Sequence, residues 1–412
     1  MKSRARLSAL VVNYNSGAFA VTCVDSLLVQ WERSGRARDD LDVVVVDNAS
    51  PVDQEEHLVK IEALGATVIR HDENGGYSKG MNLALSHTDG GPKDVVAILN
   101  PDLCFLPGAI DVLMDYLEDH PECGLVTPKA TIDPIGKLNL PRNFLPTFWD
   151  QALMGASVIY PWVARHYSKK RFPYNHELWS ADGPLISEMI SGCCMFLRRE
   201  TMGKIGGLLD ERYPLYYEDT DLVYRITQAN LTIVHHCGSR VLHHWSRSAG
   251  VGDVFAGEPQ RRYEISRKLY FDRWYGPIRR RLMGFLDRWF ASRPDEKKMR
   301  PIYPMQQLGG FDGPVEIQLP RKYKRILVEI SVNPLFLVAV GIYADDVERW
   351  VCPEETWAWY FQSEYWSRVM DLETGEMIGA YQFSKTVPGR NEPMSAEELR
   401  ALGSRVFGGQ AV

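Results

Sequence analysis

The chain has 412 residues, of which 45% are hydrophobic and 24% charged, ordinary values for a protein that buries a sizeable core. Its 47 basic and 53 acidic side chains give a formal net charge of -6, so the overall charge does not point to nucleic acid as a partner. This composition excludes a disordered, collagen-like or coiled-coil chain, and the length favours two domains or one enlarged α/β domain.

The apolar runs are too short for a membrane span, and the cysteines do not suggest a disulfide framework. The longest clean apolar run, 335–344, has ten residues, whereas a spanning helix needs about twenty. The seven cysteines are an odd number without regular spacing. We therefore expect a cytoplasmic protein with reduced thiols.

The first hundred residues alternate between strand and helix patterns. The expected strands are 7–13, 41–47, 67–71 and 94–99, and the expected helices are 18–31, 55–64 and 79–86. Val43 to Val46 are four β-branched residues in a row, which is typical of a strand buried on both faces of a parallel sheet. This order predicts a doubly wound α/β domain.

Polar residues stand where three of these strands end. Asn13 and Asn15 follow the first strand, Asp47 ends the second, and Asn100 and Asp102 follow the fourth. Because ligands of such sheets bind beyond the carboxyl ends of the strands, the three clusters together predict a binding site. Any one of them alone could be a structural turn.

The remaining chain divides into less regular parts. From about Thr131 to Leu185 aromatic residues and prolines are frequent, and a long irregular insertion is expected. Strands are then expected at 188–198, 231–236 and 240–244, and helices at 199–205 and 222–229. Past Pro301 the expected strands are 315–319, 325–332, 335–343, 357–361 and 380–384. The predicted division is a nucleotide-binding domain over 1–260, a basic aromatic helical segment over 261–300 and a small β-rich domain over 301–412.

The segment 261–281 is basic within an acidic chain. It holds eight Arg or Lys and two acidic residues, a local charge of +6, and aromatic residues are interleaved with them. Two interpretations remain open: a helix that packs its aromatic side chains on the core, or a helix that lies on an anionic membrane surface.

A second aromatic cluster lies in the β-rich part, between Trp350 and Trp366. Aromatic side chains can stack on sugar rings, so acceptor binding is one hypothesis. A packed core or a subunit interface, and with the latter a homo-oligomer, is the alternative.

Two common nucleotide-binding motifs are absent. No Gly-x-Gly-x-x-Gly follows the first strand. The span from Gly75 to Gly80 has P-loop spacing, but Met81 and Asn82 stand where Lys and Ser or Thr are required. A dehydrogenase or a P-loop kinase is therefore disfavoured.

Two carboxylates are candidates for chemistry. Asp102 would lie at the sheet edge, where it can offer hard oxygen ligands to a divalent cation. Asp219 precedes the expected helix 222–229, where it could cap the helix or act as a general base. A single histidine of the His243-His244 pair could reach a metal.

Six motifs in a fixed order give the sequence a resemblance to a known family. They are Val12-Asn13-Tyr14-Asn15, Asp47-Asn48-Ala49-Ser50, Asn74-Gly75-Gly76-Tyr77-Ser78-Lys79-Gly80-Met81-Asn82, Leu99-Asn100-Pro101-Asp102, Ser191-Gly192-Cys193-Cys194 and Tyr217-Glu218-Asp219-Thr220-Asp221. From about residue 7 to 280 the chain resembles the family 2 inverting glycosyltransferases of the GT-A fold, closest to the rhamnosyltransferase-like branch. The β-rich remainder lies outside the resemblance.

The resemblance implies a role for each matching residue. Asp47 would hydrogen-bond the base or ribose of a nucleotide-sugar donor, and Lys79 would neutralise phosphate charge. Asp102 and His244, or its neighbour His243, would bind Mg or Mn, while Asp219 would be the catalytic base. The remaining donor-binding residues would be Asn13, Asn15, Asn74, Gly76, Asn82 and Asn100. Asn100 stands where the family's metal-binding motif commonly has Asp, which leaves one carboxylate fewer.

The resulting expectation is an inverting, metal-assisted transferase that moves a sugar, with rhamnose as the candidate, from a dTDP- or UDP-sugar to a surface-glycan or lipid-linked acceptor. It would work in the cytoplasm, with peripheral contact to the inner face of the membrane through 261–281. Two alternatives stay open: an inactive nucleotide-sugar or glycan-binding module, and a sugar-1-phosphate nucleotidyltransferase.

Overall fold

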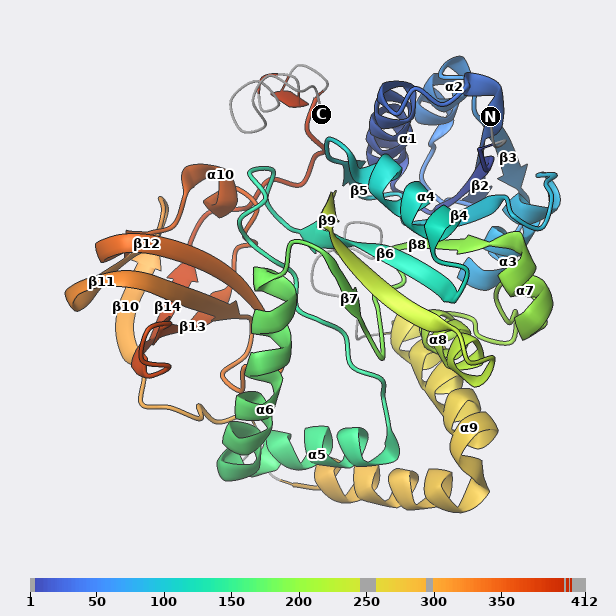
Figure 1. Cartoon of the computed structure of the whole chain (residues 1–412). Coiled ribbons are helices and arrows are strands. Elements are labelled where there is room, and N and C mark those ends of the chain that lie inside the picture. The colour runs from blue at the N-terminus through green and yellow to red at the C-terminus, as the bar shows by residue number, and fades with distance from the viewer. Residues whose placement is uncertain (1–3, 245–256, 294–298, 396–397, 400, 402–412) are drawn as a thin grey trace.

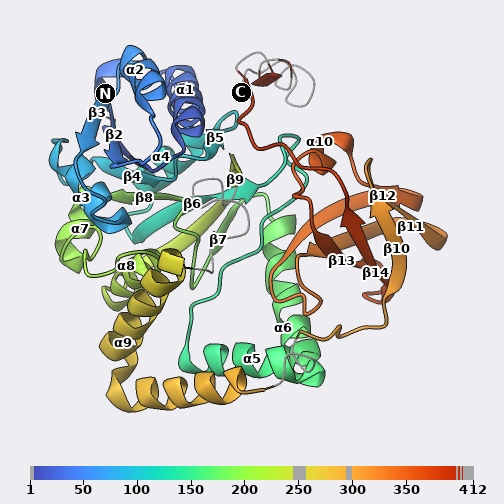
Figure 2. The same ribbon diagram turned by 180° about the vertical axis from the view of Figure 1, so that it is seen from behind.

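A computed structural model describes residues 4–244, 257–293, 299–395, 398–399 and 401. It contains two sheets joined by helices (Figures 1 and 2). The larger sheet is built from β1 (Leu7–Asn13), β2 (Leu41–Asn48), β3 (Thr67–His71), β4 (Val95–Leu99), β5 (Leu103–Phe105), β6 (Cys123–Thr131), β7 (Pro184–Ile186), β8 (Cys194–Arg198) and β9 (Thr232–His243). Its helices are α1 (Gly17–Arg33), α2 (Glu55–Ala63), α3 (Tyr77–Ser86), α4 (Ala109–Asp119), α7 (Arg199–Ile205) and α8 (Glu218–Gln228).

The strand order places a ligand site at one edge of the larger sheet. The order is β3-β2-β1-β4-β8-β6-β9-β5, with β7 paired to β9, and the first four strands are parallel. The chain winds outward from β1 to β3 and returns to β4, so the order reverses between β1 and β4. Ligands of open α/β sheets bind at such a point. Apolar side chains from α1, α2 and α4 cover one face, and those from α3, α7 and α8 cover the other. The predicted doubly wound α/β architecture is confirmed.

The second sheet is formed by residues 306–385. Its strands are β10 (Gln306–Phe311), β11 (Glu316–Ser331), β12 (Ala339–Val351), β13 (Glu364–Asp371) and β14 (Met377–Lys385), in the order β10-β14-β13-β11-β12. The aromatic residues between Trp350 and Trp366 supply much of its core, including Trp357, Tyr360 and Tyr365. The packed-core interpretation of this cluster is therefore the one that the structure supports.

Three helices lie outside both sheets. They are α5 (Phe148–Ile159), α6 (Pro161–Ser180) and α9 (Gly257–Ala291), which is kinked at Gly276. Figures 1 and 2 show α5 and the second half of α9 along one edge of the molecule. None of the helices among the described residues is both long and apolar enough to cross a membrane.

Two sequence expectations are wrong. The irregular insertion over about 131–185 contains α5 and α6, and its pattern is weak because Pro173 lies inside α6 and α5 exposes apolar side chains. The strand expected at 357–361 is instead the end of α10 (Glu354–Trp357) and the turn after it. In addition, the two strands expected at 231–236 and 240–244 form the single strand β9.

Candidate active site

The carboxylate of Asp47 is fixed at the carboxyl ends of β1 and β2. The Nδ2 of Asn13 donates a hydrogen bond to Oδ1 of Asp47 at 2.7 Å, and the hydroxyl of Ser50 donates to the same oxygen at 2.6 Å. Asn15 belongs to the same edge, because its backbone N–H donates to the Ser50 hydroxyl at 2.9 Å. Parallel pairing of β1 with β2, with Asn13 opposite Asp47, brings these residues together.

The loop before α3 is tied to the end of β2. The Nδ2 of Asn48 donates to Oδ1 of Asn74 at 3.0 Å, and the same oxygen accepts the N–H of Gly76 at 3.1 Å. Asn74 and Gly76 therefore shape this loop. Lys79 lies exposed in the first turn of α3.

Asn82, on α3, contacts the segment that follows α7. Its Nδ2 donates to the backbone oxygen of Leu209 at 2.9 Å and to Glu211 at 3.0 Å, and its Oδ1 accepts the N–H of Leu209. These contacts hold the loop after α7, so the structure does not bring Asn82 to the strand ends.

Asp102 lies against a histidine of β9. Its carboxylate is 2% exposed, and its Oδ1 lies 3.4 Å from Nε2 of His243. The pairing of Leu103 with His243 in the β5–β9 ladder sets this approach. The ring of His244 instead lies between Phe19 and Trp359, with centroids 5.2 and 4.3 Å away. Thus His243 faces the Asp102 carboxylate, while His244 meets it through the backbone, its N–H donating to the Asp102 carbonyl oxygen at 3.0 Å.

The negative charge of Asp102 and the positive charge of His243 stabilise each other. Burial alone would raise the pKa of Asp102, but His243 and His244 lower it below its ordinary value. Burial alone would lower the pKa of His243, yet Cys193 and Asp102 raise it well above its ordinary value. An ionised carboxylate is a suitable ligand for a hard cation. Oδ1 of Asp102 accepts no hydrogen bond within the described residues, so it can accept a cation.

The protein would supply only part of a metal coordination sphere. No group of three Asp, Glu, His or Cys side chains placed to hold a metal ion is found in the described parts of the chain. Asp102, and His243 once its ring gives up its proton, would fit a divalent cation whose remaining positions are filled by ligand oxygens and water.

The Asp219 carboxylate is held at the start of α8. The N–H of Gly192 donates to its Oδ2 at 3.1 Å, and the N–H of Thr220 donates to its Oδ1 at 2.6 Å. A β-carbon at Gly192 would lie 2.9 Å from both Cβ and Oδ2 of Asp219, so only glycine permits this approach. Two consecutive residues before α8, Tyr216 and Tyr217, have φ of 62° and 66°. Such left-handed aromatic residues are strained and cluster at functional sites.

A buried acid, Glu218, and a half-buried one, Asp219, are neighbours here. Burial, followed by the charge of Asp219, raises the pKa of Glu218, and burial raises the pKa of Asp219 despite the hydrogen bonds from Thr220 and Gly192. A carboxylate with a raised pKa is a better proton acceptor near neutral pH.

Tyr77 connects the acid pair to the sheet edge at Asn100. Its hydroxyl donates to Oδ1 of Asn100 at 3.1 Å. Burial raises its pKa, and the neighbouring charges of Glu218, Asp219 and Asp102 add to the effect. Asp219 and Asp102 are therefore both near enough to influence this tyrosine. Sequence reasoning missed Tyr77, Gly192 and Glu218 as site residues, although all three stand within the quoted motifs.

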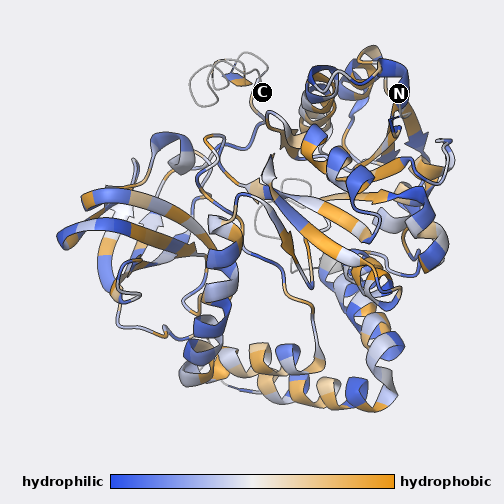
Figure 3. Cartoon of the chain, viewed as in Figure 1, coloured by the Kyte–Doolittle hydropathy of each residue, from blue (hydrophilic) through white to orange (hydrophobic). Residues whose placement is uncertain are grey.

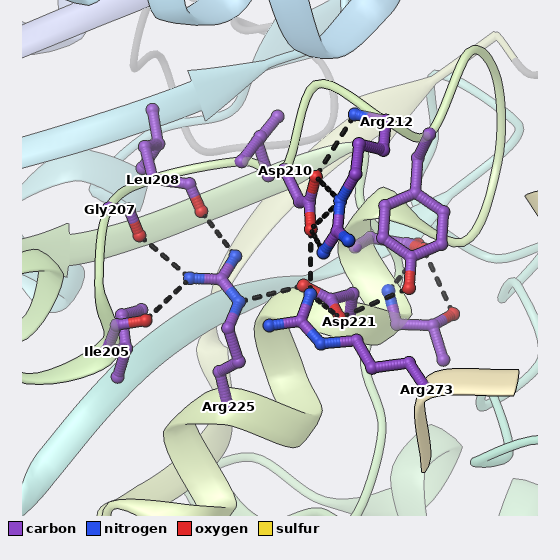
Figure 4. A network of polar contacts seen from close by, with 12 residues as sticks. Ile205, Gly207, Leu208, Asp210, Arg212, Asp221, Arg225 and Arg273 are labelled. Atoms are coloured by element: carbon purple, nitrogen blue, oxygen red, sulfur yellow. Dashed lines mark hydrogen bonds and ion pairs between the residues drawn. The ribbon is translucent and has the colours of Figure 1, made fainter. Parts of the chain in front are cut away.

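Asp221, two residues after Asp219, joins α8 to α9 (Figure 4). Its carboxylate is fully buried and accepts from Arg225 at 2.8 Å, Arg273 at 2.9 Å and Trp274 at 2.9 Å. The guanidinium of Arg225 also donates to the carbonyl oxygens of residues 205, 207 and 208. The network fixes the start of α8, and with it Asp219.

Comparison with known proteins shows which family the domain around the larger sheet resembles. The family model described as glycosyl transferase family 2 matches residues 8–203. The chain carries a family 2 glycosyltransferase domain. The match ends before Asp219 and His243, so it does not test their roles.

The chain is similar to glycosyltransferases among characterised and solved proteins. It is 25% identical over 303 residues to the N-acetylglucosaminyl-diphospho-decaprenol L-rhamnosyltransferase of Mycobacterium tuberculosis, covering 68% of this chain and 90% of the relative. A mannosyltransferase from Pyrobaculum calidifontis, solved with GDP-Man and Mn2+, is 17% identical with a TM-score of 0.39, covering 72% of this chain and 78% of that one. GalNAc-T7, solved with UDP, GalNAc and Mn2+, is 14% identical with a TM-score of 0.42, covering 69% and 54%.

The family membership confirms the resemblance and the GT-A-type fold that it implies. It also favours a sugar transferase over the nucleotidyltransferase alternative.

Proposed function

We propose that this glycosyltransferase moves a sugar from a nucleoside-diphosphate donor to a hydroxyl of a lipid-linked saccharide, with inversion at the anomeric carbon. The observation that carries the proposal is that the charges of Asp219 and Asp102 both act on Tyr77, whose hydroxyl donates to Asn100 at the sheet edge where Asp47 also lies. The proposed base and the proposed metal ligand would thus share this edge with the residues proposed to bind the nucleotide.

Asp219 and the Asp102–His243 pair would have different roles in the reaction. Asp219 takes the proton of the acceptor hydroxyl as its oxygen bonds to the anomeric carbon, and the bond to the diphosphate breaks. A base positioned in this way contributes about 10²–10⁴ in rate. One base on the face opposite the leaving group gives inversion. Asp102 and His243 would hold Mg or Mn, which supplies charge stabilisation for the departing diphosphate.

The donor residues complete the proposal. Asp47, oriented by Asn13 and Ser50, is placed to accept hydrogen bonds from the base or ribose. The exposed Lys79 would meet phosphate charge. The remaining proposed donor residues are Asn15, Asn74, Gly76 and Asn100.

The name of the mycobacterial relative supports the finer assignment. We propose rhamnose, carried by dTDP, as the sugar, and a saccharide attached through diphosphate to a polyprenol as the acceptor class. This assigns the chain to cell-envelope polysaccharide synthesis at the cytoplasmic face of a membrane, with the basic residues of 261–281 contributing to peripheral contact.

The test is substitution of the base. Asp219→Asn keeps the size and polarity of the side chain but cannot accept the proton. Calorimetry with nucleoside diphosphates and Mn2+ should give unchanged affinity, while sugar transfer should fall by about 10²–10⁴. Transfer at the rate of the unsubstituted protein would remove the base assignment. Absence of both transfer and nucleotide binding in the unsubstituted protein would remove the proposed function.

A further inference from the structure

The edge formed by α5, the start of α6 and residues 277–291 of α9 has an apolar outer surface, which we call the platform. Its exposed apolar side chains are Trp149, Leu153, Trp162, Ile278, Leu282 and Phe285. Ile278 is 80% exposed, and Trp149 and Trp162 are each 73% exposed. Figure 3 shows hydrophobic residues along both long helices of this edge. Large apolar side chains gathered in this way mark an interaction surface.

The outer side chains follow helical spacing. Residues 278, 282 and 285 are spaced by four and three and therefore share one face of α9. Trp149 and Leu153 are four apart on α5. The two helices touch where Phe290 packs on Gly155, since a β-carbon there would lie 2.6 Å from the Phe290 ring. The exposed apolar residues of α5 and α9 thus lie on two adjoining helices.

The platform is firmly attached to the catalytic part of the chain. On its inner side, Phe148 and Met283 pack with Tyr217, the residue before Glu218 and Asp219. The first half of α9 folds back on the second through an ion pair of Arg267 with Asp287 at 2.7 Å. The platform has an inner face buried against the site and an outer face left in water.

The first half of α9 buries its aromatic side chains more deeply, although Ile265 there is 45% exposed. Tyr270 and Phe271 are buried with Tyr217, and Trp274 donates to Asp221. For the aromatic residues of 263–275 the core-packing interpretation therefore holds, and three of the platform's exposed apolar side chains lie beyond the kink.

The charge around the outer face is positive. Arg279, Arg281 and Arg288 are exposed on the same half of α9. The acidic residue of this half, Asp287, is neutralised by Arg267. Exposed tryptophan and aliphatic side chains bordered by arginine are typical of helices that lie in the headgroup layer of an anionic bilayer. A two-fold contact between copies would instead bring the same arginines near each other.

We propose that the platform is a membrane-docking surface that inserts these side chains into the headgroup region of an anionic bilayer. The proposal extends the contact suggested for 261–281 to α5 and to the apolar face of 277–291. Its test needs neither donor nor acceptor, so its failure is separate from failure of the proposed function.

The experiment is vesicle sedimentation of the full chain with phosphatidylcholine vesicles, with and without phosphatidylglycerol. The combined variant Ile278→Ser, Leu282→Ser and Phe285→Ser should lower binding to anionic vesicles roughly tenfold or more, since each change removes apolar burial. Arg279→Gln and Arg281→Gln should each lower it roughly fivefold, and added salt should weaken binding of the unsubstituted protein.

A matched control replaces exposed apolar residues elsewhere. Val52→Ser, Val59→Ser and Ile186→Ser change side chains that are 60%, 50% and 71% exposed and lie away from the platform. This variant should bind as the unsubstituted protein does. Equal binding by both combined variants, or equal binding to neutral and anionic vesicles, would overturn the proposal. The proposal would also be overturned if the platform variant bound vesicles normally but had a lower mass in sedimentation velocity. The platform would then be a contact between two copies of the chain.

Discussion

Asp219 and Asp221 stand two residues apart at the start of α8, yet their surroundings are opposite. Asp221 is fully buried, and two arginines and a tryptophan donate to it. Asp219 accepts hydrogen bonds from Gly192 and Thr220, and no basic side chain in the described residues forms an ion pair with it. One carboxylate is satisfied and anchors two helices, while the other keeps the capacity to take a proton. A single turn of helix thus separates a structural carboxylate from the proposed catalytic base.

The largest expected effect on stability is at Asp221. Asp221→Ala leaves the buried guanidinium of Arg225 without its carboxylate and should lower the free energy of unfolding by about 3–5 kcal/mol. Urea unfolding followed by circular dichroism measures the change. Asp219→Asn is the matched control and should stay within about 1 kcal/mol of the original protein. Similar losses of unfolding free energy in both variants would contradict the different roles given to Asp221 and Asp219.

The next prediction tests whether the close approach of Gly192 to Asp219 matters for activity. Gly192→Ala puts a methyl group where Asp219 now lies, so the carboxylate must shift. A displacement of this size should lower kcat by roughly 10–100-fold, with little change in KM for the donor.

The control for that variant is Gly203→Ala, within α7, where a new β-carbon would meet no atom within 4 Å. It should leave kcat unchanged and raise stability by about 0.5–1 kcal/mol. If Gly192→Ala retained full kcat, the close approach of Gly192 to Asp219 would not be needed for catalysis.

The smallest effect concerns pH. The raised pKa of Asp219 means that transfer is lost as pH falls through that pKa and is retained above it. Burial and Asp219 raise the pKa of Glu218 to about 8, so Glu218 is neutral on the acid limb and Glu218→Gln should leave that limb of the kcat/KM profile in place. A limb that moves to lower pH would show that Glu218 is ionised beside Asp219.

Much of the fold near the donor edge follows from local sequence. The run Val43 to Val46 can only be buried on both sides, which fixes a central strand, and polar residues mark the strand ends. Choosing between His243 and His244 needed the β5–β9 register, which depends on residues more than a hundred positions apart.

The platform was not predictable for a different reason. In α5 and α6, apolar residues point to water as well as to the core, so the helical periodicity that reveals a buried face is blurred. The exposed apolar side chains that made these helices hard to predict are also the basis for the proposed membrane contact.

The ion pair of Arg267 and Asp287 across the kink of α9, and the apolar cluster that holds Phe148, Met283 and Tyr217, link the start of α8 to the platform. If the platform docks on a bilayer as proposed, this packing would set the distance between Asp219 and the lipid headgroups. Acceptor hydroxyls close to the lipid phosphates would then be within reach, and each added sugar would carry the next terminal hydroxyl farther away. Such a geometry would favour the addition of one residue per acceptor.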